Sequence, residues 1–175
     1  MGARTMFDWT GWFRKQLGAS ADAFVWAYSR IEPYRYEQLP PDPGYMGTWP
    51  AARLIWHVAE YERSLVLPTM KQWLGGDMPR ADAWPDSDDA WRAVRNRSFE
   101  ALTSAFLKTR QQQIDLLDDL DGFDWEGLYD TGWGPRSLAW VVTKTYQHTF
   151  EHGDTLLRMG LWWDIIEQEI AAGNR

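Results

Sequence analysis

The chain has 175 residues, of which 45% are hydrophobic and 15% aromatic, and it carries a formal net charge of -7 at pH 7. This composition excludes a disordered chain, and the acidic charge disfavours binding to nucleic acid and to anionic membrane surfaces. The sequence contains no cysteine. Disulfides, thiolate metal ligands and a nucleophilic thiol of the chain's own are therefore excluded together.

The length, without any break in composition, predicts a single domain over residues 1–175 with a core of its own. The stretch from Met1 to Trp12 has no apolar segment of the kind that secretory signals carry. No apolar run approaches the ~20 residues that a helix needs to cross a bilayer. We therefore expect a cytoplasmic protein that binds no membrane.

The first half of the chain predicts two long helices, because apolar residues recur at helical spacing and no segment alternates like a strand. The first helix is expected over residues 7–28. A connection rich in proline follows it. The second helix is expected over residues 50–74, with Pro50 in its first turn and Pro68 kinking it or splitting off its last turns.

The second half predicts two further long helices and a short tail helix. The third is expected over residues 87–120, with Ser87 as its N-cap. The fourth is expected over residues 134–159, where Gly160 would end it, and the tail helix over residues 161–170. Four long helices and a tail indicate an all-α protein built as a four-helix bundle.

Three histidines, His57, His148 and His152, are the residues most suggestive of chemistry. His148 and His152 are four residues apart, so they share one helix face with Cβ atoms ~5–6 Å apart. Both fall within the apolar stripe of the fourth helix, and His57 has equally apolar surroundings on the second. A buried imidazole without a partner costs ~1–3 kcal/mol. Facing helices of a bundle can bring such residues together around one ion.

The three histidines together predict the ligands of one divalent transition metal, such as zinc, nickel or iron. Three protein ligands leave a coordination position open, as catalytic sites require. Taken singly, His57 is more often an ordinary core histidine, and the pair His148 and His152 is as often accidental as functional. The metal is favoured because all three histidines fit one site and none is left over.

Two carboxylates lie close to the histidines in sequence. Glu60 follows His57 by three residues, and Glu151 directly precedes His152. Each is a candidate fourth ligand, proton acceptor or orienting partner of an imidazole, although a solvated or salt-bridged carboxylate is the more frequent case. The segment from His148 to His152 also reads H-x-x-E-H, a zinc-peptidase motif. The short chain and the upstream histidine make that match weak.

The tryptophans are expected to fill the bundle core rather than to bind a cofactor. Four are predicted as core anchors: Trp56, Trp73, Trp91 and Trp140. Trp162 and Trp163 are adjacent and cannot both face one core. One of the two is expected at a subunit contact or at the mouth of a pocket.

Two segments resemble the DinB-like, YfiT-related superfamily. Residues 49–63, read as WPAARLIWHVAEYER, resemble its second helix, and residues 133–154, which contain HTFEHGD, resemble its last bundle helix. The resemblance implies a four-helix bundle with one long crossover connection, often in a homodimer. It also implies a three-histidine metal centre, which falls on His57, His148 and His152 here.

The resemblance further implies a small-molecule substrate. Characterised members include transferases that join low-molecular-weight thiols, such as mycothiol or bacillithiol, to electrophiles, and thiol-dependent maleylpyruvate isomerases. A thiol that arrives as a cosubstrate suits a chain without cysteine. Two alternatives remain: a non-catalytic metal-binding or stress-response protein, and a metal-dependent hydrolase with Glu60 or Glu151 as base.

Overall fold

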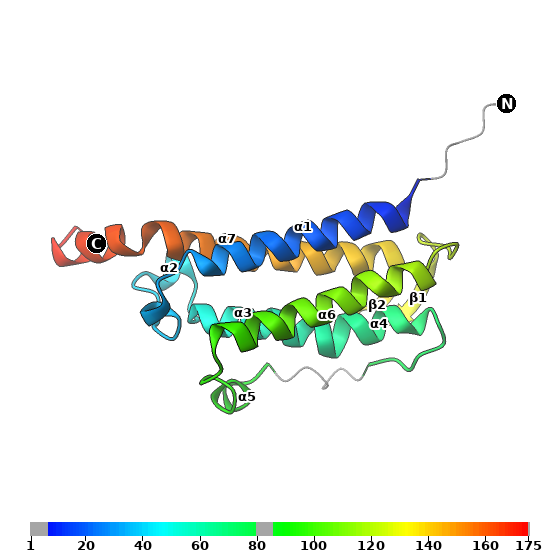
Figure 1. Cartoon of the computed structure of the whole chain (residues 1–175), viewed down its shortest axis with the longest axis horizontal. Helices are drawn as coiled ribbons and strands as arrows, with labels where there is room; N and C mark the ends of the chain where they lie inside the picture. Colours follow the sequence, from blue (N-terminus) through cyan, green and yellow to red (C-terminus); the bar gives the residue numbers. More distant parts are fainter. Residues whose placement is uncertain (1–6, 80–85, 175) are drawn as a thin grey trace.

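The computed structural model describes residues 7–79 and 86–174, and long helices dominate it (Figure 1). The prediction of a mostly helical protein is therefore confirmed. Within the described residues the elements are, in chain order, α1 (Trp9–Ser29), the 3₁₀ turn η1 (Pro33–Arg35), α2 (Pro43–Met46), α3 (Ala51–Tyr61), the π-helical turn η2 (Glu62–Val66), α4 (Leu67–Gln72), α5 (Asp88–Arg92), α6 (Phe99–Asp119), β1 (Leu128–Thr131), β2 (Gly134–Ser137) and α7 (Leu138–Ala171).

The long helices pack side by side, as Figure 1 shows for α1 and α7. Helix α6 packs against both α1 and α3, and α3 also contacts α7. The starts of these helices follow from side-chain caps, because Asp8, Ser98 and Ser137 accept hydrogen bonds from the backbone of the first turns of α1, α6 and α7. None of the described helices combines the length and the apolar character that crossing a membrane requires.

The expected second helix, residues 50–74, is present as α3, η2 and α4 in direct succession. The helix departs from regular α-helical geometry at the π-helical turn η2, which spans Glu62–Val66. This turn ends two residues before Pro68, where the kink was predicted. A π-helical turn inserts one extra residue into the helix, and such turns are frequent at functional sites. This turn places Glu62 in the interior, where its side chain is fully buried.

The expected third helix, residues 87–120, is wrong as a single element. Ser87 does cap a helix, but α5 ends at Arg92, and α6 begins only at Phe99. Ser98 starts the second helix because its Oγ accepts a hydrogen bond from the backbone N–H of Ala101 at 3.2 Å. Between the two helices Val94 still packs against the core, but the residues that follow it, Arg95, Asn96 and Arg97, are exposed and do not continue a buried face.

A short hairpin was missed in the sequence. Strands β1 and β2 pair antiparallel, with Leu128 opposite Ser137 and Thr131 opposite Gly134. Gly134 adopts a φ of 76°, which glycine tolerates best, so this residue ends a turn. The fourth helix begins at Leu138 and not directly after the Gly134–Pro135 turn as expected. Four-residue strands are too short for an alternating pattern to reveal them.

Helix α7 does not end at Gly160, which corrects the prediction of a separate tail helix. It continues to Ala171, and its end reaches beyond the other helices (Figure 1). At Gly160 an added Cβ would lie 3.1 Å from the Cβ of Arg30. The glycine therefore permits close approach of α7 to the end of α1, and it does not terminate the helix.

The tryptophan predictions are largely confirmed. Three of the four expected anchors are buried, while Trp140 is 37% exposed with the guanidinium of Arg136 over its ring, which corrects that assignment. Trp163 enters the core and Trp162 is 42% exposed, so the adjacent pair faces two directions. What covers Trp162 in solution stays a prediction.

Buried side chains form two apolar clusters with a polar layer between them along the helices. On α6, Phe106 belongs to one cluster and Leu116 to the other. Arg110 lies between these two residues in sequence and is 1% exposed. On α7, His148 and Thr149 lie in the same way between Val142 of one cluster and Leu156 of the other. Arg110, His148 and Thr149 thus lie at one level of the long helices, between the two apolar clusters.

Candidate metal centre

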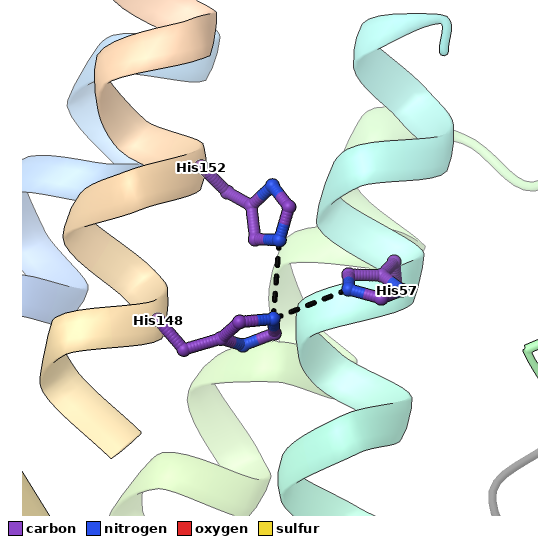
Figure 2. Close-up of side chains that lie close together, drawn as sticks. All are labelled: His57, His148 and His152. Carbon is purple, nitrogen blue, oxygen red and sulfur yellow. Dashed lines mark hydrogen bonds between the residues drawn. The ribbon is translucent and has the colours of Figure 1, made fainter. Parts of the chain in front are cut away.

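The three predicted histidines meet in the interior between α3 and α7. His57 projects from α3 toward His148 and His152 of α7, and the imidazoles point at one another (Figure 2). The Nε2 atom of His148 lies 3.2 Å from that of His57 and 3.1 Å from that of His152. One nitrogen from each ring lies within 4.8 Å of the other two. The convergence of the side chains is shown, and that they bind an ion stays a prediction.

These distances fit a shared metal ion. Two nitrogens that each bind one ion at ~2.0–2.1 Å with tetrahedral geometry lie roughly 3.3 Å apart. The observed separations of 3.2 and 3.1 Å are close to this value. Three imidazole nitrogens without a thiolate suit zinc, nickel or ferrous iron better than calcium or magnesium. The residues present therefore fit the group that the sequence predicts.

Burial keeps the imidazoles in the neutral form that binds metals. His57 and His148 are 5% and 8% exposed, and His152 is partly buried. Desolvation, followed by the neighbouring His152, lowers the pKa of His148 to about 2. Desolvation and the nearby His57 lower the pKa of His152 to about 4. Desolvation also lowers the pKa of His57, so protons compete poorly with a metal at this site.

Asp86 is a site residue that the sequence did not reveal. Its Oδ1 lies 3.3 Å from Nδ1 of His57, on the side of the ring away from the other histidines. A carboxylate at Nδ1 holds the proton there and leaves Nε2 as the ligand atom. Asp86 precedes α5 and is 29 positions from His57, so no helical spacing connects the two. The one signal that the sequence offers is its position directly before Ser87, the predicted N-cap.

The two candidate carboxylates are not part of the histidine group. Glu60 accepts a hydrogen bond from Nε of Arg63 at 2.9 Å. Glu151 has a side chain that is 55% exposed, and its Oε2 lies 3.8 Å from Nζ of Lys144. Both are therefore ion-paired carboxylates of the kind that the sequence analysis considered more frequent. Neither supports the H-x-x-E-H peptidase arrangement, in which the glutamate acts as general base at the metal.

Aromatic rings enclose the imidazoles on two sides. The ring of Tyr61 has its centroid 4.2 Å from that of His148. The ring of Trp49 meets His57 edge to face at 4.9 Å between centroids. Large apolar surfaces at these positions exclude water from the buried side of the site and strengthen electrostatic interactions there.

The comparisons with known proteins place this architecture in a family. The family model of the DinB superfamily matches residues 16–156, a span that contains all three histidines, and the chain belongs to this superfamily. No curated protein matches the sequence.

Among solved structures, the chain is similar to a histidine-to-alanine variant of the mycothiol-dependent maleylpyruvate isomerase, with a TM-score of 0.59 and 14% sequence identity. The similarity covers 86% of this chain and 63% of that chain, so this chain spans less than two thirds of its neighbour's length. At this identity the likeness shows a shared fold.

Proposed function

We propose that the protein is a metal-dependent S-transferase that joins a low-molecular-weight thiol to a small electrophile. The observation that carries the proposal is the convergence of three neutral Nε2 atoms of His57, His148 and His152. Membership of the DinB superfamily and the fold shared with a mycothiol-dependent enzyme add support. The absence of cysteine fits a thiol supplied as cosubstrate.

The proposed reaction has a simple balance. The thiol sulfur forms a bond to the electrophilic carbon, the leaving group departs with its bonding electron pair, and the thiol proton passes to solvent. A free thiol with a pKa near ~8.5 is mostly protonated at neutral pH and therefore weakly nucleophilic. A divalent ion held by the three imidazoles would supply the charge that stabilises the thiolate.

The chain's own residues have separate tasks in this proposal. The three imidazoles would hold the ion, and Asp86 would orient His57 through its contact with Nδ1. Tyr61 and Trp49 close the site against water on their sides. A partly buried His152 leaves the reactants an approach from its side. Orientation of two reactants in such a site supplies much of a rate enhancement.

We extend the proposal to the setting in which the site works. Residues 1–175 would form one domain, built as a four-helix bundle of the DinB type. It would act in the cytoplasm as a homodimer on a small-molecule substrate. The packing of α1, α6 and α7 with the α3–α4 segment supports the bundle.

Cobalt-substituted protein tests the proposed chemistry. Addition of a panel of small thiols is expected to produce sulfur-to-cobalt charge-transfer absorption with the true cosubstrate, and the His152→Ala variant is expected to lose it. Conjugation of the same thiol to chlorodinitrobenzene should depend on His152 in the same way. If no thiol perturbs the cobalt spectrum while phosphate esters do, the transferase proposal fails and metal-assisted hydrolysis replaces it.

Chelation separates a catalytic centre from a structural one. The two apolar clusters hold the helices together without an ion, so removal of the metal is expected to leave the helical circular dichroism unchanged. Thermal stability should fall only modestly, as expected when a ligand that stabilises the folded state by binding is removed. Unfolding of the chain by a chelator at 25 °C would instead identify a structural metal and count against an enzyme.

A further inference from the structure

A shallow cavity of about 230 Å³ lies directly beside the histidine cluster. Its walls come from the connection between α2 and α3, from α3 itself and from α7. The lining residues are Gly47, Thr48, Trp49, Leu54, His152 and Thr155. His152 belongs to the cavity and to the cluster alike, so a molecule in the cavity would touch the candidate metal centre.

Among the described residues, the lining carries no ionisable side chain except His152. Two arginines lie on neighbouring turns, and both are already paired. Nη1 of Arg53 lies 2.7 Å from Oδ1 of Asp88. Arg158 is bonded to Asp154 and to the carbonyl oxygen of Tyr45. A carboxylate or phosphate in the cavity would find no unpaired cation among these residues.

Trp49 has the largest side chain in the lining of the cavity, and its ring is held in place. The guanidinium of Arg53 lies 4.4 Å from the centroid of its ring, and the edge contact with His57 fixes it from another side. A fixed indole offers a flat platform to a planar group.

Gly47 keeps the cavity open. It adopts a φ of 80°, and an added Cβ would lie 3.3 Å from Cγ2 of Thr155, another lining residue. Any side chain at this position would therefore narrow the space beside His152.

We propose that this cavity is the subsite for the electrophile, and that it takes a flat, uncharged, ring-sized group against Trp49. The inference rests on the proposed function and adds the class of the acceptor. The volume exceeds the ~150 Å³ of an engineered cavity that binds benzene, and is below the ~300 Å³ typical of drug-sized ligands. A single substituted ring matches that size. With the open position of the ion taken by the thiolate, the lining leaves an anionic acceptor no further cation to pair with.

Two probes of equal shape and different charge test the inference on the isolated full-length protein. Binding of 4-fluorotoluene and of 4-fluorobenzoate is measured by fluorine NMR titration, without thiol or turnover. Metal-free protein is used so that the carboxylate cannot coordinate the ion. The uncharged probe is expected to bind more tightly than the anion. Replacement of Trp49 by alanine should weaken it by roughly tenfold, because a stacked ring loses its platform. Replacement of Thr155 by phenylalanine should weaken it by filling the cavity.

Trp140→Ala is the matched control, since that indole is exposed elsewhere on α7 and is expected to leave binding unchanged. Tighter binding of the anion, or equal binding by wild type and both cavity variants, would overturn the inference. The cobalt–thiol absorption distinguishes this failure from failure of the proposed function. If a thiol binds the metal while Trp49→Ala binds the uncharged probe as tightly as wild type does, only the proposed acceptor subsite is wrong.

Discussion

Replacement of Arg110 by methionine is expected to lower the free energy of unfolding by about 3–5 kcal/mol, because it leaves a buried carboxylate without its cation. Arg110 and Glu62 are 1% and 0% exposed. The guanidinium bonds both carboxylate oxygens of Glu62, and it also donates to the carbonyl oxygen of Leu17 at 2.7 Å. Further donated bonds of 2.7 and 2.8 Å reach the hydroxyls of Ser20 and Thr149. One side chain thus links α1, η2 and α7 to its own helix α6.

Urea unfolding followed by circular dichroism measures this effect. Arg158→Met is the control, because Arg158 is paired with Asp154 on the surface, where such pairs contribute ~0–1 kcal/mol. The double variant Arg110→Met/Glu62→Gln should recover a large part of the loss, since no charge then stays buried. An Arg110→Met variant no less stable than the control would show that the buried pair does not stabilise the fold.

Substitution of His57 or His148 by alanine is expected to weaken metal binding by more than about 100-fold. Loss of an outer partner of a ligand costs ~10–100-fold in affinity, and loss of a direct ligand should cost more. The metal affinity of Asp86→Asn is therefore expected to lie between those of these variants and of wild type, because Asp86 contacts Nδ1 of His57 and would act on the ion through that ring. Competition with a chelating dye measures the affinities.

Glu60→Gln is the matched control for these variants. Glu60 lies one turn from His57 on the same helix, but it is paired with Arg63 outside the histidine group. Its substitution should leave the metal affinity within about twofold of wild type. Retention of a full metal equivalent by His57→Ala after gel filtration would remove His57 from the site.

The histidine cluster was predictable because the spacing of residues along a helix determines the face on which each side chain lies. Four-residue spacing placed His148 and His152 on one face, and the apolar neighbours of His57 showed that it faces the interior. The contact of Asp86 with His57 was not predictable, since it joins a loop to a helix through tertiary packing. Spacing rules reach only the neighbours within one element.

Single glycines and serines caused the errors in helix boundaries. Gly160 was expected to end a helix, yet it serves the close approach of Arg30 to α7. Ser98 was expected inside a helix, yet its hydroxyl caps a new one. Both residue types have more than one structural role, and the tertiary neighbours decide between them.

The buried network around Arg110 was also outside the reach of the sequence. An arginine on a helix is usually exposed, and nothing in the spacing of Glu62 and Arg110 pairs them. The π-helical turn that begins at Glu62 leaves no pattern in the residues. The level of the polar layer, with the network and the histidines at the same height of the bundle, is a property of the packing alone.

Anomalous scattering from crystals of the protein, measured on both sides of the zinc, nickel and iron edges, tests the metal centre most directly. The expected result is one peak among the three Nε2 atoms, ~2.0–2.1 Å from each, with a non-protein ligand at a remaining position. The edge at which the peak appears identifies the metal. Absence of any peak between His57, His148 and His152 after incubation of the protein with each metal would contradict the proposed centre.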